Sequence, residues 1–199
     1  MTFRTARILV AAGAFLAGLV LVTAIALLVG GRSMDLGVQQ VAKVGGPFRL
    51  TDHEGRTVTD QDLKGRPFLV FFGFTHCPDV CPTALFEISE ILRKLGSGGE
   101  KVRALFITVD PERDTPRALK DYLSSFDSRI IGLTGDPAEI AAVVKAYRGH
   151  FRKVPLDGGG YTMDHTAIVY LMGKDGRFVS PFSLKRTIEA AAADLRKQL

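Results

Sequence analysis

The longest uninterrupted apolar stretch lies near the N-terminus, over residues 8–29. Its 22 residues carry no charge, and Thr23 is the one polar side chain among them. At about 1.5 Å per residue, a helix of this length crosses the hydrocarbon core of a bilayer, which is about 30 Å thick. We therefore expect a transmembrane anchor. The alternative is a cleaved signal peptide, but its apolar region usually runs about 7–15 residues, and the small pair Ala24-x-Ala26 lies inside this stretch.

Beyond the anchor, the pattern divides into a linker and one domain. Residues 30–43 show no sustained periodicity and are predicted to be a tether, with residues 1–7 in the cytoplasm and residues 44–199 in the domain. Short apolar runs bounded by glycine, proline or polar turn residues predict the strands of this domain. They are a hairpin over 48–58 that turns at 52–55, and strands over 68–74, 102–109, 130–133, 167–172 and 177–179.

Helical spacing of apolar residues predicts helices between these strands. Residues 82–95 carry leucine and isoleucine at intervals of three and four. Thr115-Pro116 and Asp136-Pro137 predict two helix starts, because each pairs a capping side chain with proline at the first helical position. Ser183 is a candidate cap for a last helix reaching Leu199. The alternation predicts an α/β fold with a central mixed, largely parallel sheet, to which the last hairpin adds an antiparallel edge.

Charge adds information mainly about the membrane. Of 26 basic residues, Arg4, Arg7 and Arg32 flank the anchor, which leaves 23 against 21 acidic residues and gives no reason to expect nucleic acid as a partner. Two arginines before the span and one after it favour a cytoplasmic N-terminus. Seven preceding residues are too few for an organelle transit peptide. We expect a single-pass protein of the bacterial inner membrane, with its domain in the periplasm.

The chain has two cysteines, Cys77 and Cys81, directly after the predicted strand over 68–74. If a helix begins near Pro82, both sulfurs lie at its N-terminal end, where amides and the helix dipole lower thiol pKa values. The thiols are then candidates for redox chemistry or metal binding. The alternative is a purely structural disulfide, but one that closes so short a loop stabilises little, and strained disulfides are more often redox-active.

Among the four histidines, His165 is the candidate third ligand. It lies before a predicted core strand and after Gly158-Gly159-Gly160, in what we expect to be a mobile loop. The other three have local interpretations: His53 in a solvated turn, His150 in a loop, and His76 in local packing or hydrogen bonding. A structural role for His165 stays open. Two thiolates and an imidazole suit copper, especially Cu(I), whereas zinc would require a fourth ligand that the sequence does not supply.

Acidic residues beside these candidates have two interpretations. Asp79 and Asp164 either support the ligands or are turn residues. The charged run 110–116 follows the strand over 102–109, at the strand end where α/β proteins place their sites, but its charges could equally stabilise a loop.

Together these motifs resemble the Sco/SenC family of membrane-anchored, thioredoxin-like copper proteins of cytochrome c oxidase assembly. The resemblance extends from about Val44 to the C-terminus, and it rests on four motifs: Gly45-Gly46-Pro47-Phe48, residues 72–82, residues 109–116 and Asp164-His165-Thr166. It implies a thioredoxin-like domain whose copper ligands are Cys77, Cys81 and His165. The glycine-rich stretch 156–160 departs from the family pattern and leaves the position of the histidine segment open.

The resemblance implies a metallochaperone that carries Cu(I) or Cu(II) to the Cu(A) centre in subunit II of cytochrome c oxidase, with other periplasmic copper chaperones as further partners. Such a protein is not an enzyme. The enzymatic alternative is a thiol–disulfide oxidoreductase that keeps the Cu(A) cysteines reduced, with Cys77 and Cys81 as its redox-active thiols. Their C-x-x-x-C spacing departs from the C-x-x-C of general reductants. A peroxiredoxin-like peroxidase is a more distant third hypothesis.

Overall fold

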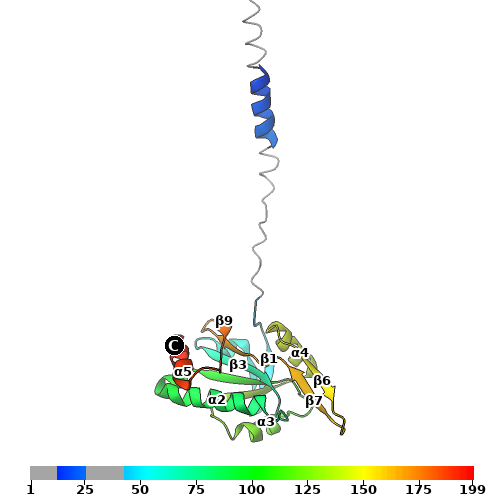
Figure 1. Cartoon of the computed structure of the whole chain (residues 1–199), viewed down its shortest axis with the longest axis vertical. Helices are drawn as coiled ribbons and strands as arrows, with labels where there is room; N and C mark the ends of the chain where they lie inside the picture. Colours follow the sequence, from blue (N-terminus) through cyan, green and yellow to red (C-terminus); the bar gives the residue numbers. More distant parts are fainter. Residues whose placement is uncertain (1–12, 26–42) are drawn as a thin grey trace, which may run out of the picture. The chain divides into compact units, whose positions relative to one another are not determined.

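The computed structural model of the chain describes residues 13–25 and 43–199, which belong to two separate units with a boundary after Ala42. In the first unit, residues 13–25 form a helix (Figure 1). No helix among the described residues is long and apolar enough to cross a membrane. The predicted anchor over 8–29 and the predicted tether over 30–43 lie partly outside the described residues, so both stay predictions.

A seven-stranded sheet forms the centre of the second unit, in the order β2-β1-β5-β4-β3-β8-β9. Its three inner strands are apolar and mostly buried because both faces of the sheet are covered. The strands are β1 (Arg49–Asp52), β2 (Thr57–Thr59), β3 (Phe68–Gly73), β4 (Arg103–Thr108), β5 (Ile130–Thr134), β8 (Val169–Met172) and β9 (Phe178–Pro181). Each corresponds to a predicted strand.

The sheet is mixed, as predicted, but the expectation that it is largely parallel is wrong. Only β3–β4 and β4–β5 pair in parallel. The pairs β1–β2, β1–β5, β3–β8 and β8–β9 are antiparallel. The physical reason is that hairpins at both ends of the domain add antiparallel strands to both edges, whereas each parallel pair needs a crossover helix.

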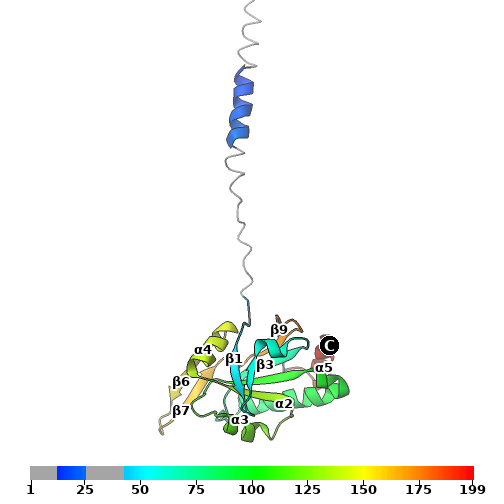
Figure 2. The same cartoon turned by 180° about the vertical axis from the view of Figure 1, so that it is seen from behind.

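Four helices and a separate two-stranded hairpin lie around the sheet. The helices are α2 (Val80–Leu95), α3 (Pro116–Leu123), α4 (Pro137–Ala146) and α5 (Ile188–Arg196), with short 3-10 turns η1 (Asp60–Leu63) and η2 (Gly96–Lys101). The hairpin pairs β6 (Phe151–Pro155) with β7 (Tyr161–His165). Figures 1 and 2 show α2 beside α5, and α4 beside the β6–β7 hairpin on the other side of the domain.

Aromatic contacts identify which element covers which face. The rings of Phe71 in β3 and Tyr122 in α3 both pack at a tilt against Phe106 of β4, on the face that also carries α2. Phe72, the next residue along β3, points to the opposite face, where it meets Tyr147 at the end of α4. Alternation along one buried strand therefore sends neighbouring side chains to two different layers.

The predicted helix starts are confirmed for α3 and α4. Thr115 caps α3 by accepting a hydrogen bond of 3.2 Å from the Ala118 amide, and Asp136 forms a capping box with Glu139 at the start of α4. The last helix differs from the prediction. Its cap is Thr187 rather than Ser183, because the chain continues without regular structure after β9 until the Thr187 hydroxyl accepts from the Ala190 amide at 3.3 Å.

The β6–β7 hairpin was not predicted. The segment expected to be a mobile loop before His165 forms five antiparallel residue pairs, and His165 is its last strand residue, opposite Phe151. Gly159 and Gly160 have positive φ angles, so they form the turn of this hairpin. The expectation that His53 is solvated is also wrong, since its half-buried ring accepts a hydrogen bond of 2.9 Å from the Gly132 amide and ties β5 to the β1–β2 turn.

Candidate metal centre

The two thiols lie where β3 ends and α2 begins, as the sequence predicted. The helix starts at Val80, two residues earlier than expected, so Cys81 lies in its first turn and Cys77 precedes it. The backbone amide of Cys81 donates a hydrogen bond to the Cys77 sulfur at 3.4 Å. Both cysteines are free; Cys77 is half-buried and Cys81 is fully buried. The sulfurs are therefore close together, with Cys77 on the accessible side.

A glycine makes room for the buried sulfur. A Cβ atom added to Gly73, the last residue of β3, would lie 2.8 Å from the Cys81 sulfur and 2.4 Å from the Phe106 ring. Cβ atoms do not approach other atoms this closely without displacing them. Gly73 is therefore required for the position of Cys81 under the end of the sheet.

His165 completes the group from the end of β7. Its Nε2 atom lies 3.8 Å from the Cys81 sulfur. Its Nδ1 atom lies 3.2 Å from the Thr166 carbonyl oxygen. A carbonyl can only accept a hydrogen bond, so Nδ1 carries the ring proton and donates it, and Nε2 keeps its lone pair for a metal. The ligand atoms of Cys77, Cys81 and His165 all lie within 4.8 Å of one another.

Burial determines the protonation of two of these groups. It raises the pKa of the Cys81 thiol far above its ordinary value, although a hydrogen bond from the Phe74 backbone partly opposes the shift. The prediction that the helix terminus lowers this pKa is therefore wrong, because desolvation outweighs the dipole. Burial also lowers the pKa of His165, so its imidazole is neutral at pH 7. A neutral imidazole binds metal without first losing a proton.

Asp114 fixes the segment that carries the thiols. Its buried carboxylate accepts hydrogen bonds from the Thr75 amide at 3.0 Å, from the Thr75 hydroxyl at 2.6 Å and from the Thr108 hydroxyl at 2.6 Å. Thr75 stands two residues before Cys77, and Thr108 ends β4. The carboxylate thus joins the cysteine segment to the neighbouring strand.

Asp110 and Arg113 fix the β6–β7 hairpin, which carries His165, in a similar way. The Asp110 carboxylate accepts a hydrogen bond from the Tyr161 hydroxyl at 2.9 Å and pairs with the Arg113 guanidinium. That guanidinium lies 3.9 Å from the centre of the Tyr161 ring and donates to the Tyr161 carbonyl at 3.1 Å. The charged run 110–116, for which the sequence left two interpretations, therefore supports both halves of the site.

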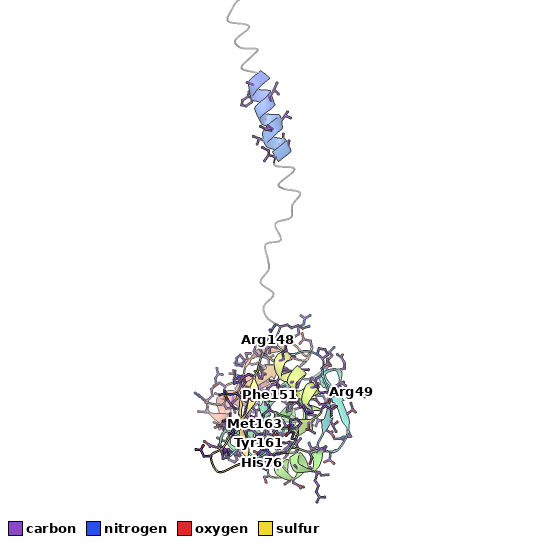
Figure 3. The ribbon with its side chains drawn as sticks, turned by 90° about the vertical axis from the view of Figure 1, so that its right-hand side faces the viewer. Arg49, His76, Arg148, Phe151, Tyr161 and Met163 are labelled. Atoms are coloured by element: carbon purple, nitrogen blue, oxygen red, sulfur yellow. The ribbon has the colours of Figure 1, made fainter. Side chains whose placement is uncertain are left out.

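Phe74 packs between Arg113 and the third candidate ligand, His165. Its buried ring stands edge-on to the His165 ring, with centroids 5.7 Å apart, and the Arg113 guanidinium carbon lies 5.9 Å from the centre of the Phe74 ring. Figure 3 shows Phe151, Met163 and Tyr161 along the hairpin, with His76 of the cysteine segment at the same end of the domain as Tyr161 in this view. The imidazole is thus held by packing as well as by its backbone hydrogen bond.

The remaining candidates do not join the group. Asp79 is exposed at the start of α2 and makes no capping hydrogen bond. Asp164 pairs with Arg152 at 2.9 Å and faces His150 at 3.9 Å. His76 is exposed, and among the described residues its ring forms a hydrogen bond only with the Thr75 hydroxyl, at 3.0 Å. The local interpretation of His76 is confirmed.

Several supporting residues were not predicted individually. Thr75, Thr108 and Tyr161 act through hydrogen bonds that join distant segments, so their roles depend on sheet order. One signal was present: Thr108 is a polar residue that follows the apolar run 104–107 of β4, and buried polar groups need partners.

The donor set favours a soft metal. Two thiolate sulfurs and one neutral imidazole match the ligands that Cu(I) prefers, and within the described residues this is the one group of at least three histidine, cysteine or carboxylate ligands that could hold an ion. The accessible position of Cys77 leaves a side from which another protein can approach. The group can therefore bind a copper ion or, without metal, cycle between dithiol and disulfide.

Comparison with known proteins gives consistent matches over the same part of the chain. The SCO1/SenC family model matches residues 37–199. Human mitochondrial SCO1 homolog is 43% identical over 154 residues, which cover 75% of this chain and 51% of that protein. The chain thus spans about half the length of this relative.

Two solved structures extend the match to three dimensions. The copper-bound structure of Bradyrhizobium japonicum ScoI has a TM-score of 0.76 and 65% identity, covering 78% of this chain and 99% of that one. BsSco, described as containing a disulfide switch and as a member of the Sco family of cytochrome c oxidase assembly proteins, has a TM-score of 0.63 and 26% identity, covering 79% and 94%. The fold of this chain is thus similar to that of one protein solved with copper bound and to that of another described as containing a disulfide switch.

Proposed function

The chain belongs to the SCO1/SenC family, and we propose that it is a copper metallochaperone that delivers its cargo to the Cu(A) centre of cytochrome c oxidase during assembly. The observation that carries this proposal is the convergence of the Cys77, Cys81 and His165 ligand atoms within 4.8 Å. The copper-bound relative supports it.

Copper binding at this site is an exchange of protons for metal. Burial raises the pKa of the Cys81 thiol, which therefore keeps its proton at neutral pH in the metal-free protein, and the Cys81 sulfur lies 3.8 Å from Nε2 of His165. Cu(I) replaces thiol protons and is held by two sulfurs and the imidazole. Release to a partner then proceeds by ligand exchange that begins at Cys77, the more exposed sulfur. The partner's thiolate replaces one ligand at a time, so copper does not enter bulk water.

A second candidate function uses the same thiols without metal. As a thiol–disulfide oxidoreductase, the dithiol would give two electrons to a disulfide in the Cu(A) domain, reduce it to two thiols and become a Cys77–Cys81 disulfide. The relative with a disulfide switch favours this candidate. Oxidation and copper binding exclude each other, because a disulfide offers no thiolate to the metal.

His165 distinguishes the two functions, because a reductase needs only the cysteines. Cells that carry His165→Ala should assemble less Cu(A) at limiting copper if this protein delivers metal, whereas Cys77→Ser impairs the oxidase under either function. The measurement is Cu(A) occupancy of the purified oxidase. Normal occupancy in His165→Ala would reject the chaperone and favour the reductase.

The proposed setting is the periplasmic side of the bacterial inner membrane. Residues 8–29 would anchor the chain once and hold the domain close to a membrane-bound recipient, with other periplasmic copper chaperones as donors. The support for this location is the apolar length and the flanking arginines of the sequence.

A further inference from the structure

A groove of about 260 Å³ runs beside the metal centre, between α2 and the segment that follows His165. Val80, Thr83 and Glu87 line its α2 side. These residues lie three and four positions apart, so they share one face of the helix. Ala167 and Leu184 line the opposite side.

On each side of the groove, a lining residue is close in sequence to one of the metal-ligand candidates. Val80 immediately precedes Cys81, and Ala167 follows His165 by two residues. Since Cys81 is fully buried and Cys77 is half-buried, a protein that exchanges ligands with the metal must approach over Cys77. Such a protein necessarily covers the exposed residues that surround Cys77.

The lining of the groove is largely apolar. It is formed by Phe71, Val80, Ala84, Ala167, Val169 and Leu184 together with three polar or acidic residues. Val80 is 52% exposed, and within residues 43–199 only five large hydrophobic side chains are at least 43% exposed. An apolar groove with an exposed valine beside a functional group is typical of a protein-binding surface.

The charged residues that line the groove are all acidic. Asp79 and Glu87 are its two charged lining residues, and no basic side chain lines it. Neither carboxylate forms an ion pair with the rest of the described chain. Complementarity therefore favours a partner segment that brings positive charge next to an apolar side chain.

We propose that this groove receives a short segment of the copper acceptor in which an apolar side chain is adjacent to lysine or arginine. The apolar side chain occupies the space between α2 and Ala167, and the basic one faces Glu87. Docking there places the acceptor's thiols over Cys77. This inference rests on the proposed chaperone function, and it assigns the surface that selects the partner.

A charge series at Glu87 tests the groove without altering the ligands. The full chain, purified in detergent and loaded with Cu(I), is mixed with the metal-free Cu(A) domain of oxidase subunit II, and the second-order rate constant of copper transfer is measured at low and high salt. Glu87→Gln should slow transfer a few-fold and Glu87→Lys about tenfold, with a weaker dependence on salt than wild type. Competition with a Cu(I) chelator should show unchanged copper affinity in both variants.

The matched control is Asp121→Lys, because Asp121 is a 74% exposed carboxylate on α3, outside the groove. It makes the same charge change and should transfer copper at the wild-type rate. A second variant, Val80→Thr, should slow transfer by removing exposed apolar surface from the groove, with little dependence on salt.

The possible results distinguish a failure of the groove proposal from a failure of the proposed chaperone function. If Glu87→Lys and Asp121→Lys slow transfer equally, net charge is responsible and the groove is not the docking site, although the chaperone function stands. If the wild-type protein transfers no copper, the chaperone function fails and the groove loses its proposed occupant. A photoreactive residue at position 83, which lines the groove, that crosslinks to a second copy of this chain rather than to the Cu(A) domain would also overturn the proposal.

Discussion

The hydroxyl of Tyr161 donates a hydrogen bond of 2.9 Å to the buried carboxylate of Asp110. This bond ties the hairpin that ends in His165 to the loop that follows β4. Four residues further along the same loop, Asp114 ties down the cysteine segment. One loop therefore sets the distance between the sulfurs and the imidazole, and the predictions below depend on that arrangement.

Replacing Tyr161 with phenylalanine should weaken copper binding without unfolding the domain. The change keeps the ring beneath Arg113 but leaves the Asp110 oxygen without its donor. A lost hydrogen bond of this kind is worth about 0.5–1.5 kcal/mol, so the Cu(I) affinity should fall by a factor of about 2 to 12. Competition with a chromophoric Cu(I) chelator measures it. Tyr170→Phe, at a buried tyrosine of β8, is the control.

The role of Tyr161 can be separated from a general loss of stability. If Tyr161 acts by positioning His165, then Tyr161→Phe should have no further effect on affinity in a His165→Ala background. Equal losses in the two backgrounds would show that Tyr161 acts on the whole domain.

Substituting alanine for Gly73 should displace the Cys81 sulfur and so weaken copper binding. The added methyl group would lie 2.8 Å from the Cys81 sulfur, so this sulfur or the backbone has to move. We expect a stability loss of about 1–3 kcal/mol and copper binding weakened about tenfold or more. Gly158→Ala is the control, since a Cβ there meets no atom within 4 Å. Denaturant unfolding and chelator competition should leave this control at wild-type values.

Copper affinity should rise with pH through the neutral range. Burial raises the pKa of Cys81, so its thiol keeps its proton near pH 7 and Cu(I) has to displace it. Each displaced proton makes affinity increase about tenfold per pH unit. Burial lowers the pKa of His165, so the imidazole adds no such dependence above pH 7. An affinity that is constant between about pH 6.5 and 8.5 would show that both thiols are already ionised.

The anchor can be tested on membranes. The charge-free stretch 8–29 should keep the protein in the pellet after carbonate extraction, and protease added to spheroplasts should degrade the domain but not the N-terminus. A soluble product that begins near residue 30 would identify the stretch as a cleaved signal peptide.

The sequence predicted the elements better than their arrangement. Buried runs such as Phe68–Gly73 and caps such as Asp136 depend on neighbouring residues, so both were found from local patterns. The antiparallel edges and the β6–β7 hairpin depend on which strands pair, and the alternation in that hairpin is short and interrupted by its glycine turn.

The same distinction between local pattern and long-range pairing explains which features of the site could be predicted. Cys77, Cys81 and His165 were found because their chemistry is unusual, and the structure brings all three together. The Tyr161–Asp110 bond spans 51 positions and could not be found from spacing. The pKa of Cys81 was predicted in the wrong direction because the helix start is visible in the sequence, whereas the depth of burial is not.

The central claim is that copper has three protein ligands, two sulfurs and one imidazole nitrogen. X-ray absorption spectroscopy of the reduced full chain loaded with one Cu(I) tests it most directly. We predict two sulfur scatterers and one nitrogen scatterer with the outer-shell signature of imidazole in the wild-type protein, and loss of that nitrogen in His165→Ala. A spectrum with sulfur alone, identical in the wild-type protein and in His165→Ala, would contradict the claim.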